Sequence, residues 1–186
     1  FTNLDYLNLS NNNLNGSIPE ELGNLNRLKY LNLAFNQLSG NIPNSIGNLV
    51  SLEEIRLFQN ELSGSIPQEL GNLNALTHVN FRNNNLSGSI PASIGNLNSL
   101  EILYLHNNNL NGYIPSEIFG LTNLKRLFLH NNQLSGTLEE NISDLISLDR
   151  FRIEYNDMSG VISQNICNLG LQWADSISFN ISNLSL

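Results

Sequence analysis

Residues 28–48 read LKYLNLAFNQLSGNIPNSIGN, and the chain repeats this phrase along nearly its whole length. Leucines at 4, 28, 52, 76, 100, 124 and 148 open successive copies at a fixed step of 24 residues. Each copy follows the pattern LxxLxLxxNxLSGxIPxxLGNLxx, in which the first leucine is position 1. A period in this range is typical of solenoids, in which each unit stacks only on its neighbours.

The segment LxxLxL predicts a half-buried strand in every copy. Apolar positions 1, 4 and 6 are expected to point into the core, and positions 2, 3, 5, 7 and 8 to face an open, concave side. Position 9 is asparagine throughout, and we expect its amide to satisfy buried backbone groups of the turning chain. The later ELGNL-like segments predict short helical or 3-10 turns on the convex side. We therefore predict an α/β solenoid with a parallel β-sheet on its concave face.

The copies are expected to form a single domain over residues 1–186, with seven full repeats in residues 4–171 and an irregular terminal repeat in residues 172–186. A two-residue insertion around Trp173 restores the register and places Ile177 on a core position. Neither end carries a cap of the kind that protects solenoids, so the chain is expected to be a fragment that lacks both caps.

Composition restricts the classes of function. The formal net charge is -8, which argues against nucleic-acid binding. No apolar run approaches the roughly 20 residues that span a bilayer, and no signal peptide is expected at the start, which has no n-region and h-region, so this segment is not expected to insert into a membrane. The one cysteine, Cys167, is expected to be a packed structural thiol, and a cysteine-rich metal site is excluded. No metal or cofactor is expected.

Glycosylation sequons favour an extracellular location. The candidate acceptors are Asn8, Asn15, Asn85, Asn141, Asn180 and Asn183.

Positive charge is concentrated on the predicted concave positions, which hold seven of the eight Lys and Arg residues and all three histidines. Position 2 sets opposite signs side by side on adjacent strands, as with Lys29 and Glu53, and predicts weak structural pairs. Position 3 instead sets Arg126 beside Arg150, which costs stability. Arg152 follows on the same face.

This basic group lies beside two aromatic residues, Tyr104 and Phe128, which are expected to stack. Such a cluster suits a carboxylate-bearing ligand with an apolar portion, although a solvated surface with Asp149 and Glu154 as counter-charges remains the alternative. An earlier aromatic group, Tyr6, Tyr30, Phe35 and Phe58, predicts a further contact surface. The candidate ligand-binding residues are Arg56, Phe58, His78, Arg82, Tyr104, His106, Arg126, Phe128, His130, Arg150 and Arg152.

The half-phrase LSGxIPxxLGNL resembles the plant-specific class of leucine-rich repeats, which occurs in receptor-kinase ectodomains, receptor-like proteins and polygalacturonase-inhibiting proteins. The resemblance implies a right-handed superhelix, a second small sheet along the LSGxIP flank, and binding on the concave or lateral face. Arg150-Phe151-Arg152 resembles the Arg-x-Arg pair with which several plant peptide-hormone receptors hold the free C-terminal carboxylate of a peptide.

Together these features favour an extracellular module of the apoplast that recognises a peptide or protein on its concave face, as part of a receptor ectodomain, with a co-receptor as a further partner. A secreted inhibitor of a cell-wall-degrading hydrolase is the alternative, because an acidic exterior suits a basic enzyme. An ice-binding solenoid fits less well, since the concave rows are irregular and charged. Enzymatic activity is not expected, because an open sheet has no pocket that excludes water.

Overall fold

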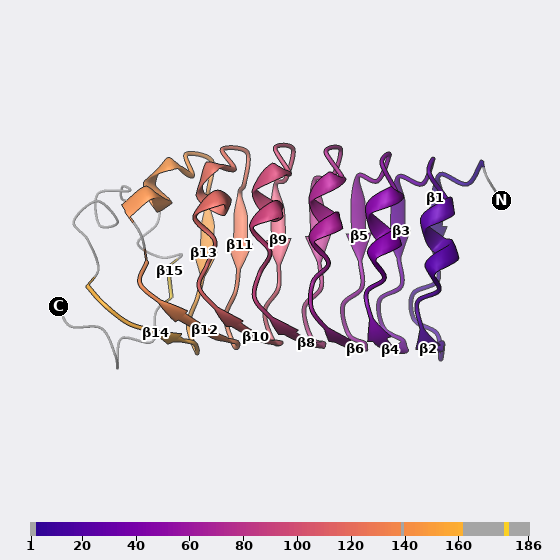
Figure 1. The fold of residues 1–186 in the computed structure, drawn as a ribbon, viewed down its shortest axis with the longest axis horizontal. Coiled ribbons are helices and arrows are strands. Elements are labelled where there is room, and N and C mark those ends of the chain that lie inside the picture. Colours follow the sequence, from indigo (N-terminus) through magenta and orange to yellow (C-terminus); the bar gives the residue numbers. More distant parts are fainter. Residues whose placement is uncertain (1–2, 139, 162–176, 179–186) are drawn as a thin grey trace.

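The computed structural model describes residues 3–138, 140–161 and 177–178. Each copy forms one coil of a solenoid, with two parallel sheets and a row of 3-10 helices (Figure 1). The predicted fold class is confirmed. Within the described ranges, no helix has the length and apolar character needed to cross a membrane.

The main sheet has eight parallel strands in the order β1-β3-β5-β7-β9-β11-β13-β15. Equal repeat positions pair across it, as in Tyr6↔Tyr30 and Arg126↔Arg150, so side chains form straight rows. Ile177 pairs with Phe151, which is 26 residues earlier and not 24, and this confirms the two-residue insertion. The strands are β1 Tyr6–Asn8, β3 Tyr30–Asn32, β5 Glu54–Arg56, β7 His78–Asn80, β9 Ile102–Tyr104, β11 Arg126–Phe128, β13 Arg150–Arg152 and β15 Ile177–Ser178.

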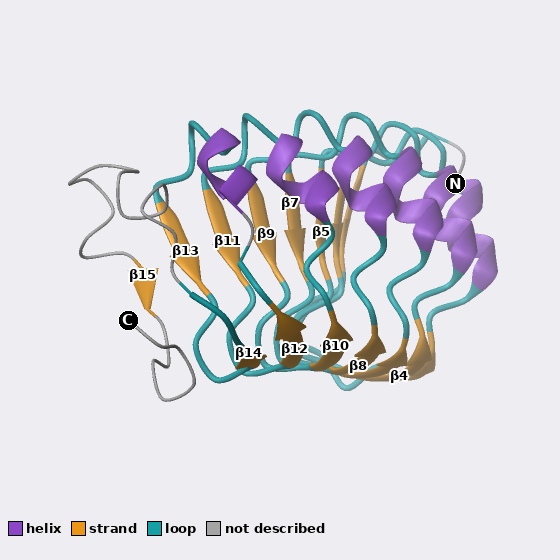
Figure 2. Cartoon of the chain, turned by 60° about the vertical axis from the view of Figure 1, so that its left-hand side comes forward, coloured by secondary structure: helices purple, strands orange, loops and turns teal. Residues whose placement is uncertain are grey.

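A second sheet of seven strands and, in the first six coils, a row of 3-10 helices follow the main sheet (Figure 2). A proline with φ between -60° and -70° precedes each of η1 to η5 and fixes the approach to the helix. The second sheet contains β2 Asn15–Ser17, β4 Gln37–Asn41, β6 Glu61–Gly64, β8 Asn85–Gly88, β10 Asn109–Gly112, β12 Gln133–Gly136 and β14 Asp157–Met158. The helices are η1 Glu20–Asn24, η2 Asn44–Asn48, η3 Gln68–Asn72, η4 Ala92–Asn96, η5 Ser116–Gly120 and η6 Glu140–Asp144.

Position 9 joins the coils as predicted. The Asn108 Nδ2 donates to the carbonyl oxygen of Leu105 in its own coil (3.0 Å) and of Phe81 in the preceding coil (3.1 Å). Its Oδ1 accepts a hydrogen bond from the Leu86 amide at 3.0 Å. Because the other coils repeat this geometry, the asparagine row is structural.

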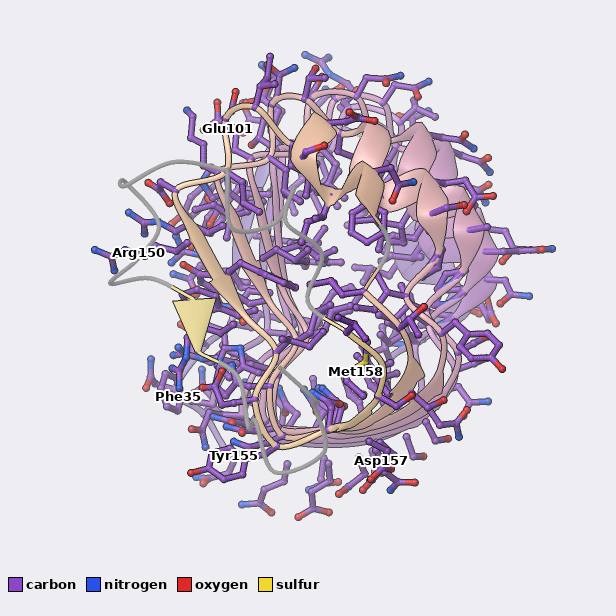
Figure 3. The ribbon with its side chains drawn as sticks, turned by 90° about the vertical axis from the view of Figure 1, so that its left-hand side faces the viewer. Phe35, Glu101, Arg150, Tyr155, Asp157 and Met158 are labelled. Atoms are coloured by element: carbon purple, nitrogen blue, oxygen red, sulfur yellow. The ribbon has the colours of Figure 1, made fainter. Side chains whose placement is uncertain are left out.

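Position 8 has a left-handed backbone in every coil, with φ between 53° and 57°. Asparagine or glutamine fills most of these sites, but Phe35 and Tyr155 fill two of them. Both side chains project from the same edge of the main sheet (Figure 3). A left-handed residue with a β-carbon is strained by about 1–2 kcal/mol, least of all for asparagine, so these two aromatic residues are unfavourable local choices.

The prediction that position 7 faces solvent is wrong for much of the row. Ala34 is fully buried, and His106, His130 and Glu154 are 7%, 5% and 5% exposed. The strands of the main sheet end at position 5, and the left-handed residue at position 8 then turns the chain. The side chain between these points therefore packs against the ring or chain at position 5, as His106 does against Tyr104.

The glycine of the GNL segment allows neighbouring 3-10 helices to approach closely. A β-carbon on Gly71 would lie 2.4 Å from the backbone oxygen of Ser93. Phe119 holds this position in the fifth copy and is 2% exposed. Cys167, which holds it in the seventh copy, lies outside the described residues.

Candidate functional site

Three arginines gather on the solvent face of β11 and β13. Arg126 and Arg150 are register partners on adjacent strands, and Arg152 lies two residues further along β13. Arg150 projects from the sheet away from the core (Figure 3). We call Arg126, Arg150 and Arg152 the arginine cluster; the predicted adjacency of Arg126 and Arg150 is confirmed.

Two aromatic rings lie beside the arginine cluster. Tyr104 and Phe128 are stacked, with ring centroids 4.6 Å apart and an interplanar angle of 17°. Arg152 lies over the Phe128 ring at 5.8 Å. The Tyr104 hydroxyl acts on Arg126 and raises the pKa of the Arg126 guanidinium. The cluster therefore combines cationic donors with a flat apolar surface.

The arginines differ in how they are neutralised. The Arg126 Nε lies 3.9 Å from Asp149, and the Arg152 Nε donates to the Glu154 Oε1 at 2.7 Å. Arg150 makes no ion pair with any residue that the structure describes. Arg150 is therefore the cation of the cluster that is most available to an incoming anion.

Two histidines lie beneath the aromatic pair. The rings of His106 and His130 stack with centroids 4.3 Å apart. Burial, followed by the charges of His130, Arg82 and Arg152, lowers the pKa of His106 to about 3. Burial and Arg152 also lower the pKa of His130, against an opposing effect of Glu154. Both imidazoles are thus neutral near pH 7, and they are too enclosed to contact a ligand as they stand.

A second group of side chains occupies the N-terminal half of the face. Tyr6 and Tyr30 stack at 4.4 Å, and Arg56 lies over the Tyr30 ring at 5.4 Å. Phe35 and Phe58 meet edge to face at 5.0 Å.

Two further predicted site residues lie beside this group. The Arg82 guanidinium lies 4.6 Å from the centre of the Phe58 ring. His78 lies on β7, and its Nδ1 is 2.8 Å from the Thr77 hydroxyl. The predicted site residues thus form two clusters along one face.

Sequence reasoning treated Glu154 as an exposed counter-charge and overlooked Tyr155. Glu154 is buried and holds Arg152 from below, and Tyr155 is 64% exposed at a left-handed position. The burial of Glu154 could have been inferred from its repeat position, which it shares with His106 and His130. The signal for Tyr155 was an aromatic residue where most other copies carry an amide.

The remaining polar features are structural or peripheral. Lys29–Glu53 and Lys125–Glu101 pair across adjacent strands at 3.1 and 2.8 Å, as position 2 predicts. An open depression of about 460 Å³ lies on the flank, between the second sheet and the helices, and not on the main sheet. In the part of the chain that the structure describes, no group of His, Cys, Asp or Glu side chains is arranged to hold a metal ion.

The candidate glycosylation sites differ in exposure. Asn8, Asn15 and Asn85 are exposed, whereas Asn141 is half-buried and its Oδ1 is enclosed. Asn180 and Asn183 lie outside the described residues.

Comparisons with known proteins agree with the repeat fold. The family model described as Leucine Rich Repeat matches residues 3–25, 27–49, 51–73, 75–97, 99–121 and 123–145. Comparison with curated proteins gave no match.

Several solved structures are similar. One is the LRR ectodomain of the Arabidopsis thaliana membrane receptor kinase GASSHO1/SCHENGEN3 in complex with CASPARIAN STRIP INTEGRITY FACTOR 2, at 34% identity and a TM-score of 0.87, covering 96% of this chain and 21% of that chain. Another is the Arabidopsis receptor kinase HAESA in complex with the peptide hormone IDA and the co-receptor SERK1, at 31% identity and a TM-score of 0.69, covering 100% of this chain and 34% of that chain. A plant ice-binding protein matches at 29% identity and a TM-score of 0.73, covering 98% of this chain and 66% of that chain. The chain thus spans 21% and 34% of the lengths of the two receptor chains.

Proposed function

The chain belongs to the leucine-rich repeat family, and we propose that it is an extracellular recognition module that binds a peptide on the face of its main sheet, as part of a receptor ectodomain. The observation that carries this proposal is the arginine cluster beside the stacked Tyr104 and Phe128 rings.

The chemistry of the cluster suits the free C-terminus of a peptide. Arg126 and Arg150 stand side by side at a cost in stability, and a bound carboxylate would relieve their repulsion. A guanidinium can hold a carboxylate through two parallel hydrogen bonds, with Arg150 open to it and Arg152 two residues away. The last apolar side chains of the peptide would then lie on Tyr104 and Phe128.

The similar structures support this proposal. HAESA was solved with the peptide hormone IDA and a co-receptor, and GASSHO1/SCHENGEN3 was solved with CASPARIAN STRIP INTEGRITY FACTOR 2. By analogy, we propose a peptide ligand and a co-receptor as partners of this chain, and a location at the cell surface. A complex with a secreted hydrolase stays the alternative.

The test is a titration with short synthetic peptides, each prepared with a free and with an amidated C-terminus. Amidation should weaken binding by about tenfold or more, because a charged hydrogen-bond acceptor is lost. The double variant Arg150→Ala/Arg152→Ala should abolish the difference between the two forms. Arg27→Ala is the matched control, because Arg27 lies off the main-sheet face and hydrogen-bonds Asn3.

Equal affinity for free and amidated peptides would refute carboxylate binding. Inhibition of a pectin-degrading hydrolase on mixing with the chain, without peptide binding, would favour the inhibitor instead.

Ice binding is a second candidate because the second sheet has a regular face that the concave rows lack. Positions 12 and 14 flank its glycine row and carry no charged residue in any coil. Position 12 holds Asn15, Ser39, Ser63, Ser87, Asn111, Ser135 and Ser159. Position 14 holds Ser17, Asn41, Ser65, Ser89, Tyr113, Thr137 and Val161. Parallel strands repeat these groups about every 4.8 Å.

Inhibition of ice recrystallisation is the measurement for this candidate. Ser87→Lys, in the middle of the second sheet, should abolish an activity that Asn80→Lys on the main sheet leaves intact. Absence of activity in the unmodified chain would exclude ice binding.

A further inference from the structure

Four polar side chains occupy position 7 in consecutive coils: Arg82, His106, His130 and Glu154. Each carries a buried atom without a hydrogen-bond partner, namely Arg82 Nε, His106 Nδ1, His130 Nδ1 and Glu154 Oε2. The two histidines and Glu154 are more than nine-tenths buried. Buried polar atoms are usually paired, so this row, which reaches the arginine cluster where Glu154 contacts Arg152, has unused hydrogen-bonding capacity.

Glu154 connects the buried row to the ligand-facing surface. Its Oε1 accepts hydrogen bonds from both Nε and Nη2 of Arg152, which leaves its Oε2 unpartnered. Arg152 is 44% exposed at its side chain, whereas the Glu154 side chain is 6% exposed. Arg152 can therefore turn toward a ligand, but Glu154 cannot follow it.

Removing Arg152 from Glu154 would leave a carboxylate buried without a cation, which is strongly unfavourable. His130 is the neighbour able to compensate. His130 lies in the same row on the adjacent coil, where the backbone amide of Asn131 donates to the Glu154 carbonyl at 3.0 Å. The Nδ1 of His130 has no hydrogen-bond partner. A protonated His130 would restore the missing positive charge beside Glu154.

We propose that Glu154 and His130 are positioning residues for Arg152, and that capture of a carboxylate by Arg152 is coupled to uptake of one proton by His130. This inference rests on the proposed function and adds to it a dependence on pH. In the free chain Glu154 holds Arg152 and His130 is neutral; in the complex Arg152 holds the ligand and the His130 imidazolium holds Glu154.

The direction of the pH dependence follows from the proton balance. Because the complex binds one more proton than the free chain, affinity rises as pH falls. A full proton taken up gives a change of about tenfold per pH unit. The window lies below pH 7, where the free chain keeps His130 neutral because burial and Arg152 lower its pKa.

The charged and titratable groups around His130 come from three elements. His106, which follows β9, stacks on the His130 ring. Arg152, on β13, lowers the pKa of His130, and Glu154, which follows β13, raises it. Arg82, after β7, acts on His106. Of these, Glu154 is the one anion, so it is the group that can stabilise a protonated imidazole here.

A measurement without ligand tests the coupling itself. Arg152→Ala removes the cation from Glu154, as ligand capture would, and should raise the pKa of His130 in an NMR titration of the histidine ring protons. Arg150→Ala is the matched control and should leave that titration in place, because the pKa of His130 is set by burial, Arg152 and Glu154 and not by Arg150. An unchanged His130 titration in Arg152→Ala would overturn the proposal.

A measurement with ligand tests its consequence. The probes are N-acetylated peptides with a free C-terminus and without His, Asp or Glu, so that the peptide itself does not titrate between pH 5 and 7. Their affinity for the chain should rise by up to about tenfold per pH unit on acidification. Glu154→Gln and His130→Gln should each flatten this slope. His78→Gln is the control and should leave the slope unchanged, because His78 lies on β7 and outside the buried row.

The outcomes separate the two proposals. Peptides that bind with an affinity independent of pH overturn the proton coupling and leave the proposed function standing. Failure of every peptide to bind at either pH overturns the proposed function, and the titration of Arg152→Ala then decides the coupling alone.

Discussion

The substitution Asn108→Ala offers a sharp test of how the coils are joined. The side chain is 8% exposed and makes hydrogen bonds of 3.0–3.1 Å to the carbonyls of Leu105 and Phe81 and from the Leu86 amide. Each carbonyl keeps one further asparagine donor, but the Leu86 N–H loses its acceptor. One orphaned buried amide costs about 1–3 kcal/mol and two weakened carbonyls about 0.5 kcal/mol each, so we expect a loss of about 2–4 kcal/mol.

The matched control is Asn12→Ala, at the same repeat position in the first coil. Asn12 is exposed and donates to Leu9 and Ser10 of its own coil, where water can replace it. We expect a change within about 0.5 kcal/mol. Urea unfolding followed by circular dichroism measures both variants, provided that the slope with denaturant is unchanged, because solenoids can depart from two-state behaviour. Equal losses in the two variants would refute the view that position 9 stabilises the fold by bridging buried coils.

Three further predictions concern backbone approach, strain and pH. Gly71→Ala should lose about 1–3 kcal/mol of unfolding free energy in urea, because its β-carbon would lie 2.4 Å from a backbone oxygen of the next coil. The control Gly120→Ala should lose almost none, because no atom lies within 4 Å of its β-carbon. Similar urea midpoints for the two variants would contradict this. Tyr155→Asn should gain about 1 kcal/mol and raise the thermal midpoint, because asparagine tolerates its φ of 56° better; an unchanged or lower midpoint would count against strain at this site. Acidification from pH 7 to 5 should remove about 2 kcal/mol of unfolding free energy through His106, because its folded pKa of about 3 lies below its ordinary 6.5. Stability is full above pH 6.5 and falls below it as the unfolded chain binds the proton. The loss should be smaller in His106→Phe, in which the lowered pKa of His130 still contributes, and unchanged in His78→Gln.

The scaffold could be predicted because its determinants recur in every copy. The strand positions, the asparagine row and the terminal shift to Ile177 all depend on backbone pairing that repeats from coil to coil. The burial of position 7 could not be predicted in the same way. Alternation of polar and apolar residues holds only while the chain is a strand, and the strand ends at position 5. His106 and Glu154 are polar, yet the turn that follows encloses them.

The candidate site was found where residues depart from the repeat, and the structure gives the reason why such departures are tolerated. Each coil contacts only its neighbours, so an unfavourable local choice does not propagate along the solenoid. The repelling pair Arg126–Arg150, the enclosed Glu154 and the strained Tyr155 all fall in the sixth and seventh copies. Stability alone would favour opposite charges, an apolar side chain and an amide at these positions; other coils show the apolar side chain, as in Ala34, and the amide, as in Asn131. Their concentration in two neighbouring copies agrees with the proposed peptide site, since real proteins break local rules chiefly at functional sites.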